Sequence, residues 1–210
     1  MIKDRLTPAQ HIALWDDFRG GSQEAFSQLY ELFAADLYRY GYNLVRNKQL
    51  VEDCLHELYL HLHAKRGQLG PTDNIRFYLY RSLRRRLTDA LTKLNKFVSD
   101  DYAFDNAEFL IQPYESDLIE QQTLERQKQI MVAELNKLPK RQKEILYLVY
   151  MKGLTYQQAA EVMDITMKSV YNTVNVALTT LRSYIKETML REGLFVGILL
   201  LALLSYFTNF

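Results

Sequence analysis

Basic and aromatic residues are interleaved between Asn74 and Val98. This stretch has 7 lysines and arginines against a single acid, Asp89. Basic side chains displace counterions from nucleic-acid phosphates, and aromatic rings stack on exposed bases. The combination predicts a surface that holds separated DNA strands, with Phe77, Tyr78 and Tyr80 among Arg76, Arg81, Arg84, Arg85, Arg86, Lys93 and Lys96. The alternative is that the tyrosines belong to the core and the arginines form an ordinary solvated face.

A second polar cluster lies between Glu52 and Leu62. Apolar residues recur there at helical spacing and predict a buried stripe made of Leu55, Leu58, Tyr59 and Leu62. The remaining positions predict an acidic polar face formed by Glu52, Asp53, His56 and Glu57.

A metal site is an alternative interpretation of the same segment. Cys54, Glu57 and His61 could share one helical face and ligate a cation. Structural zinc sites usually show paired CxxC or HxxxH spacings, which this segment lacks, so we expect Cys54 to be a small core residue. We expect no metal and no cofactor. We also expect no catalytic activity, because no Ser/His/Asp constellation is evident and the basic stretch lacks a carboxylate cluster.

The C-terminal half contains a predicted helix-turn-helix. Leu138-Pro139 opens a helix that runs to Met151, and Gly153 is placed to end it. A second helix begins at a Thr155/Gln158 capping box and continues to Met163, and a third runs from Met167 to Leu181. A helix-turn-helix needs a small residue where its helices cross and apolar residues beneath the helix that reads DNA. The sequence has such residues at the required positions, Ala160, Ile165, Val170 and Leu178. The alternative is a helical hairpin that binds no nucleic acid.

The elements around these clusters are expected to be helical. The chain has only 4 prolines and 8 glycines in 210 residues, and it has no GxGxxG or GxxxxGK[ST] motif, which argues against a nucleotide-binding α/β fold. From the predicted N-cap Ser22, apolar residues recur to Phe33 and resume from Leu37 to Val45, so we expect a core-facing helix pair. The predicted fold class is all-α.

Charge divides the chain into segments. Residues 1–98 have 15 Lys and Arg against 11 Asp and Glu, residues 99–125 have 8 acids and no base, and residues 126–210 have 11 bases against 6 acids. We expect two small helical domains, 1–98 and 126–188, joined by an acidic linker at 99–125 and followed by an apolar tail at 189–210. A solvated spacer is favoured for the linker over a mimic of nucleic-acid charge.

The apolar tail has 14 residues from Leu194 to Phe207. As a helix it would reach ~21 Å, against ~30 Å for a hydrocarbon core. We therefore favour docking on a partner or on the chain's own domains over membrane association. A single cysteine and an N-terminus without an unbroken apolar core favour a cytoplasmic protein.

The chain from about Gly21 to Tyr184 resembles extracytoplasmic function sigma factors, the two-domain sigma subunits of bacterial RNA polymerase. Four stretches carry the resemblance in the family's order, and four in order are far more specific than one. They are SQEAFSQLYELFAADLYRYGYNLV, VEDCLHELYLHLH, IRFYLYRSLRRRLTDAL and LPKRQKEILYLVYMKGLTYQQAAEVMDITMKSVYNTVNVALTTLR.

The resemblance implies a promoter-specificity subunit that performs no catalysis itself. Its implied partners are core RNA polymerase, through the β′ clamp helices and the β flap, promoter DNA, and an anti-sigma factor. The polymerase-binding positions would be Glu52, Asp53, His56 and Glu57. The positions that melt and read the −10 element would lie in the loop from His63 onwards and at Asn74, Arg76, Tyr78, Arg81, Arg84 and Arg85. The −35 major groove would be read by Lys168, Ser169, Tyr171, Asn172 and Asn175.

Two departures from the family pattern affect the DNA contacts. Arg85 stands where members commonly have Asn, so the preferred −10 sequence is expected to differ. The recognition helix offers only Lys168 before Arg182, which removes phosphate contacts and predicts weak −35 binding. Either Tyr171, Asn172 and Asn175 read bases with little help from phosphates, or another DNA-bound protein recruits the holoenzyme. Asp164, where a turn glycine is usual, is expected in the left-handed region.

A different class of function is a stand-alone helix-turn-helix regulator whose N-terminal half senses a ligand or dimerises. Only the sigma interpretation requires the acidic helix to bind β′. Co-purification with core polymerase therefore discriminates between the two.

Overall fold

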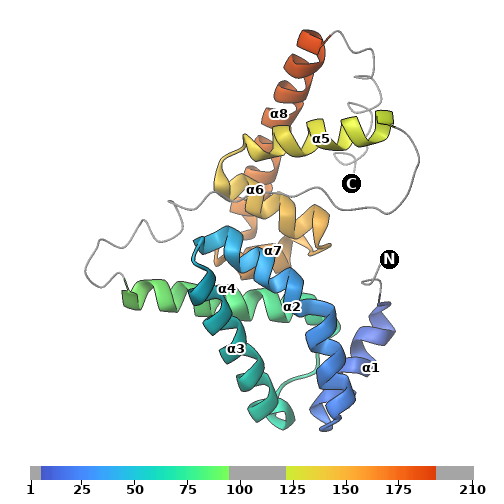
Figure 1. Cartoon of the computed structure of the whole chain (residues 1–210), viewed down its shortest axis with the longest axis vertical. Helices are drawn as coiled ribbons and strands as arrows, with labels where there is room; N and C mark the ends of the chain where they lie inside the picture. The colour runs from blue at the N-terminus through green and yellow to red at the C-terminus, as the bar shows by residue number, and fades with distance from the viewer. Residues whose placement is uncertain (1–5, 95–121, 193–210) are drawn as a thin grey trace. The chain divides into compact units, whose positions relative to one another are not determined.

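The computed structural model describes residues 6–94 and 122–192, and within these ranges it contains helices and no strand. The prediction of an all-α fold is confirmed. The helices fall into two compact units, shown in Figure 1, and each is described by itself. Most of the predicted acidic linker, and the apolar tail from Leu194, lie outside the described residues.

The first unit is built from four helices and a single 3-10 turn. Its elements are α1 (Pro8–Arg19), α2 (Gln23–Val45), α3 (Lys48–Lys65), η1 (Arg66–Gln68) and α4 (Ile75–Leu94). Helix α2 packs against α1, α3 and α4, and α3 also packs against α4. The largest side chains sealed between them are Trp15, Tyr40, Tyr80, Phe18 and Phe33.

The expectation of a helix pair between Ser22 and Val45 is wrong, because α2 is one helix. The predicted N-cap is confirmed, because the Ser22 hydroxyl accepts a hydrogen bond from the Ala25 N–H at 3.1 Å. From Gln23 onwards, however, the helix runs unbroken for 23 residues. The junction between the two apolar runs contains no glycine or proline to interrupt the backbone, and Ala34 is itself buried there.

Gly41 lies in the C-terminal part of α2, where side chains of α3 and α4 come close to its backbone. A Cβ atom at this position would stand 3.0 Å from Val51 Cγ1 of α3 and 3.3 Å from Leu87 Cδ1 of α4. The helix therefore tolerates a residue of low helix propensity because a side chain would hold α3 and α4 away.

The second unit contains α5 (Gln122–Asn136), α6 (Lys140–Leu146), a π-helical turn η2 (Tyr147–Met151) and α8 (Met167–Glu192). Helix α8 packs against both α5 and α6. The apolar stripe of α8 is buried and consists of Val170, Val174, Ala177, Leu178, Leu181 and Ile185. The short helix α7 (Tyr156–Met163) precedes α8.

The turn chemistry predicted for the helix-turn-helix is confirmed. Thr155 and Gln158 form the capping box, with N–H···O distances of 3.0 and 3.1 Å in the two directions. Gly153 and Asp164 both adopt positive φ, at 69° and 54°. The predicted end of the third helix at Leu181 is too early, because α8 continues to Glu192 and buries Ile185 on the way.

We predict that Gly41→Val lowers the free energy of unfolding by about 2 kcal/mol, because overpacking between α2, α3 and α4 outweighs the gain of less than about 1 kcal/mol in helix propensity. Urea denaturation of the full chain measures the change. Gly67→Val is the control, since a Cβ at Gly67 meets no atom within 4 Å. Equal stability of the two variants would contradict the proposed close approach at Gly41.

Candidate nucleic-acid and polymerase-binding surfaces

Helix α1 holds the loop that precedes α4. The Trp15 indole N–H donates to the Gly70 carbonyl at 2.9 Å, and the Arg19 Nε–H donates to the Leu69 carbonyl at 2.7 Å. The Trp15 ring is fully buried and lies 5.1 Å from the ring of Tyr78. The loop is thus fixed by two side chains from more than 45 positions earlier in the chain.

Sequence reasoning missed Trp15 and Arg19. The only available signal is that the single tryptophan of the chain stands in a short helix with Phe18 three residues later. That signal predicts core packing, and it does not reveal that the indole N–H is directed at a distant loop.

Asn74 begins α4 by capping it. Its side-chain oxygen accepts from the Phe77 N–H at 2.9 Å, and its own N–H donates to the Thr72 hydroxyl at 3.2 Å. Asn74 is half-buried. The predicted −10 residue is therefore also the element that fixes where the loop ends and α4 begins.

The basic and aromatic residues of α4 separate into two groups. Arg81 and Arg85 are exposed, whereas Arg76, Arg84 and Arg86 are half-buried. Among the aromatic residues, Phe77 and Tyr78 are half-buried, and Tyr80 is sealed with its ring 4.8 Å from that of Tyr40. The expectation that Tyr80 stacks on bases is wrong, because this side chain is required by the core. Lys96 lies outside the described residues.

Helix α3 has its apolar residues on one face and its acidic residues on the other, as predicted. The stripe of Leu55, Leu58, Tyr59 and Leu62 is buried, and the polar set of Glu52, Asp53, His56 and Glu57 is exposed. Each of the three carboxylates has a partner. Glu52 Oε1 lies 3.7 Å from Lys48 Nζ, Asp53 Oδ1 accepts from Gln49 Nε2 at 2.9 Å, and Glu57 Oε2 lies 3.7 Å from Arg86 Nη1.

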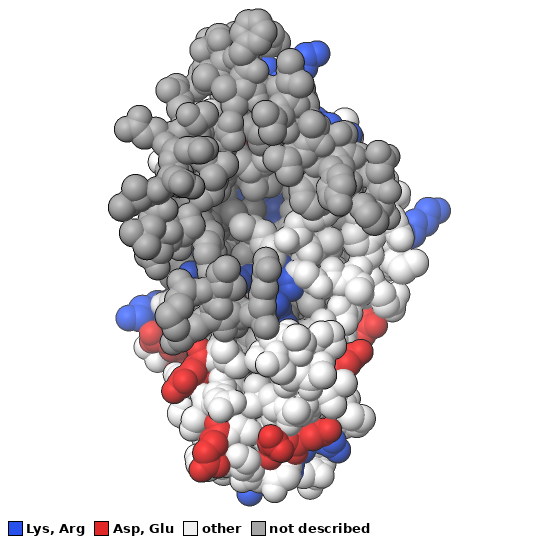
Figure 2. All heavy atoms as spheres, turned by 90° about the vertical axis from the view of Figure 1, so that its right-hand side faces the viewer, with Lys and Arg blue, Asp and Glu red and all other residues white. Residues whose placement is uncertain are grey.

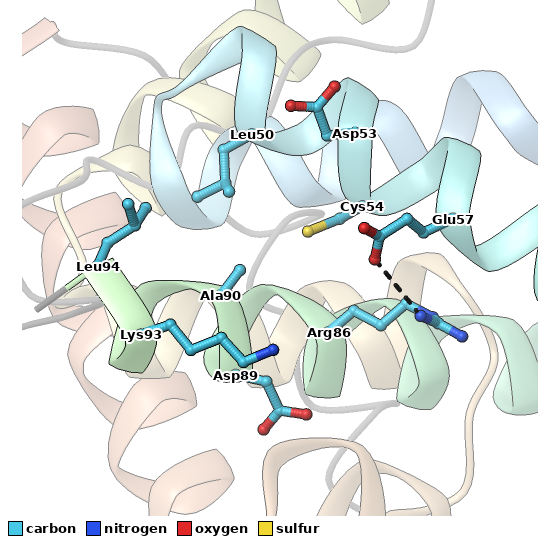
Figure 3. Close-up of a pocket in the computed structure, with 9 residues that line it drawn as sticks. All are labelled: Leu50, Asp53, Cys54, Glu57, Arg86, Asp89, Ala90, Lys93 and Leu94. Carbon is cyan, nitrogen blue, oxygen red and sulfur yellow. Dashed lines mark ion pairs between the residues drawn. The ribbon is translucent and has the colours of Figure 1, made fainter. Parts of the chain in front are cut away.

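A groove of about 390 Å³ lies between the exposed sides of α3 and α4, beside this acidic face. Figure 3 shows the Asp53 and Glu57 carboxylates on one side and Arg86 and Lys93 on the other, with the Cys54 sulfur directed between the helices. Burial chiefly raises the pKa of the Cys54 thiol, Glu57 and Asp53 raise it further, and Arg86 opposes them. The thiol therefore resists ionisation, which fits a core residue and not a nucleophile.

The residues named for the metal alternative do not form a ligand cluster. Within the parts of the chain that the structure describes, no three His, Cys, Asp or Glu side chains are grouped to hold a metal ion. All three candidate positions, Cys54, Glu57 and His61, belong to those parts.

Charge is unevenly distributed over the first unit. The face shown in Figure 2 carries Asp and Glu side chains over its lower part, where helices of this unit lie. The surface of the first unit is therefore not uniformly basic.

Helix α8 presents the predicted −35 residues at its N-terminal end. Lys168, Tyr171, Asn172 and Asn175 are exposed, and Ser169 is half-buried. The Thr166 and Thr173 hydroxyls bind the main chain of Ser169, since the Thr166 hydroxyl accepts from its N–H at 3.1 Å and the Thr173 hydroxyl donates to its carbonyl at 2.7 Å. By exposure, the residues most available for contact with a groove are the other four.

No helix in the described ranges is long and apolar enough to cross a membrane. The segment from Leu194 to Phe207, for which docking is favoured over membrane association, lies outside those ranges.

Two family models match the chain. The model for Sigma-70 region 2 matches residues 29–97, and the model for Sigma-70 region 4 matches residues 128–181. Together they match more than half of the chain. Among curated proteins, the ECF RNA polymerase sigma factor SigM of Bacillus subtilis (strain 168) is 27% identical over 148 residues, which are 66% of this chain and 82% of that protein.

Two solved structures share the fold. CnrH, in complex with the cytosolic domain of CnrY, aligns with a TM-score of 0.53 and 16% identity over 84% of this chain and 97% of CnrH. The sigma factor RpoE of Bartonella quintana, in complex with the anti-sigma factor NepR, aligns with a TM-score of 0.54 and 20% identity over 78% of this chain and 98% of RpoE.

We predict that Trp15→Phe loosens the loop before α4, because the Gly70 carbonyl loses its donor while an aromatic ring stays in the core. An unsatisfied carbonyl costs about 1–3 kcal/mol. Hydrogen exchange of the amides from Gly67 to Asn74 measures the change, and it should become faster. Phe18→Leu is the control, since it disturbs the same core without removing a donor to the loop. Equal protection of the loop in both variants would show that the indole hydrogen bond does not hold it.

Proposed function

The chain belongs to the sigma-70 family, as an extracytoplasmic function sigma factor, and from this premise we propose that it directs core RNA polymerase to promoters and opens their −10 region. The observation that carries the proposal is the match of region 2 and region 4 models to two separate helical units in the family's order. Core polymerase and promoter DNA are its partners, and the protein acts in transcription initiation without catalysing a reaction.

Core polymerase is proposed to dock on the acidic face of α3. Asp53 and Glu57 are four residues apart on exposed positions, so they project from the same side of the helix. Leu60 follows on this side and is 56% exposed. An apolar side chain beside carboxylates is typical of a protein interface, in which the apolar residue loses water and the charges select the partner. Leu60 is therefore added to the predicted docking residues, and the β′ clamp helices are the proposed partner.

The −10 element is proposed to bind the N-terminal half of α4 and the loop before it. Arg81 and Arg85 are exposed and one turn apart, which suits contacts with successive backbone phosphates. The loop carbonyls of Leu69 and Gly70 are held by α1, and this restraint lowers the entropy that ordering the loop on DNA would cost. Asn74, Tyr78, Arg76 and Arg84 are half-buried and would form the walls that receive an unstacked base.

The −35 element is proposed to bind α8 through Lys168, Tyr171, Asn172 and Asn175. The capping box at Thr155 fixes the start of α7, and the left-handed residue Asp164 makes the short turn from α7 into α8 that a helix-turn-helix requires. An anti-sigma factor is the further proposed partner, by analogy with the RpoE–NepR complex. A stand-alone regulator is the alternative, and nothing in that alternative requires an acidic, partly apolar face on α3.

We predict that Asp53→Lys with Glu57→Lys weakens capture by core polymerase at least tenfold, because like charges then face each other across the docking surface. Binding of the purified full chain to core polymerase measures the loss. Asp17→Lys with Glu31→Lys is the matched control, since it makes the same change in charge at exposed positions of α1 and α2. Unchanged helicity verifies folding. Unchanged capture by the α3 variant would exclude this surface.

We predict that Arg81→Ala with Arg85→Ala weakens holoenzyme binding to a pre-melted promoter and lowers its salt dependence. Each lost phosphate contact reduces the slope of log K against log salt concentration by about 0.7 on single strands and 0.9 on duplex. Lys48→Ala with Lys186→Ala removes the same charge from exposed positions outside the predicted DNA-binding residues and should leave the slope unchanged. The DNA assignment of α4 fails if the arginine variant keeps the wild-type slope while still binding core polymerase.

A further inference from the structure

The exposed face of α8 is poor in charge and rich in groups that recognise adenine and thymine. From Met167 to Leu181 the sequence has a single basic residue, Lys168. Asn172 and Asn175 lie on the same exposed side, and this side is bordered by Tyr171, which is 47% exposed, and by Val176, which is 53% exposed.

Each of these side-chain types has a preferred base in the major groove. Guanine is read by a bidentate Arg or Lys, adenine is read by a bidentate Asn or Gln, and the C5-methyl group of thymine is read by an apolar contact. One lysine therefore offers little capacity for guanine, whereas two asparagines and two apolar flanks match a run of A·T pairs.

Tyr171 is held in place by a second tyrosine from the preceding helix. The ring of Tyr156, at the start of α7, packs edge-on against Tyr171 with centroids 4.7 Å apart and an angle of 69° between the planes. Tyr156 is held in turn, because its hydroxyl lies 3.3 Å from that of Tyr150 in a hydrogen bond. An exposed ring supported on one side loses less conformational entropy when it meets a ligand.

The Tyr150 hydroxyl lies at the base of this cluster. Burial raises the pKa of Tyr150 well above its usual value, and the hydrogen bond to Tyr156 raises it further. Tyr150 therefore adds no negative charge that would repel phosphates.

We propose that α8 reads an A·T-rich −35 element, in which Asn172 and Asn175 bind adenines and Tyr171, positioned by Tyr156, contacts a thymine methyl group. This inference rests on the proposed function and specifies the DNA class that the same site takes. Tyr156 is a positioning residue, because it acts through Tyr171. An aromatic cluster of this kind could instead receive a protein, and the experiment below separates that outcome.

The first step is to select the element with the holoenzyme. Core polymerase loaded with the full chain initiates transcription on a promoter library randomised in both promoter elements, and the templates of the initiated transcripts are sequenced. We expect A·T pairs to be enriched in the −35 region. Asn172→Ala should reduce the preference at one adenine by about tenfold. A G·C-rich element, or none at −35, would overturn this inference while leaving polymerase binding and −10 opening intact. Absence of any chain-dependent initiation would instead reject the proposed function.

The second step measures the contribution of the thymine C5-methyl group alone to the affinity for DNA. Each thymine of the selected element is replaced singly by deoxyuridine, which removes only the C5-methyl. At one position the wild-type holoenzyme should lose about fourfold in affinity, the value of one buried carbon group. Tyr171→Ala should bind both duplexes equally, and the control Ser183→Ala, exposed farther along α8, should keep the fourfold difference.

The role of Tyr156 is tested with two substitutions in the same assay. Tyr156→Leu removes the supporting ring and should shrink the methyl effect, whereas Tyr156→Phe retains the ring and should preserve the effect. A wild-type holoenzyme indifferent to every deoxyuridine, or a methyl effect that persists in Tyr171→Ala, would overturn the assignment of Tyr171. Loss of transcription in Tyr171→Ala with unchanged DNA affinity would identify the cluster as a protein contact instead.

Discussion

The first unit depends on the close approach of three helices at Gly41. With no side chain at this position, Val51 of α3 and Leu87 of α4 both reach the backbone of α2. The buried stripes of α3 and α4 are thereby turned towards a common axis, and the polar residues of each helix must face outwards. The acidic face of α3 and the exposed arginines of α4 are consequences of that packing. Glu57 and Arg86 then pair across the groove between the two helices, as Figure 3 shows.

The second unit depends on turn chemistry instead of a close helix approach. Gly153 and Asp164 place the backbone in the left-handed region at either end of α7, and the Thr155 capping box fixes its first turn. These features hold α7 against the start of α8, where Tyr156 meets Tyr171. The position of the recognition residues on α8 therefore depends on the two short turns at Gly153 and Asp164.

Local patterns were sufficient to predict much of this molecule. The Thr155 capping box, the Ser22 N-cap, the left-handed Asp164 and the buried stripe of α3 all follow from residues within one or two helical turns of each other. The unbroken α2 was not predicted, because a change in the apolar pattern does not interrupt a helix unless the backbone is also disfavoured. The hydrogen bonds from Trp15 and Arg19 to the loop before α4, and the burial of Tyr80 against Tyr40, depend on contacts between distant parts of the chain. No local pattern contains that information.

The central claim is that this chain gives core RNA polymerase its choice of promoter. The most direct measurement is a genome-wide map of transcription start sites, made with purified core polymerase on genomic DNA, with and without the chain. The account predicts a discrete set of starts that appear only with the chain and share sequence elements near −10 and −35. Unchanged starts, together with binding of the chain to DNA in the absence of polymerase, would contradict the account and favour a stand-alone regulator.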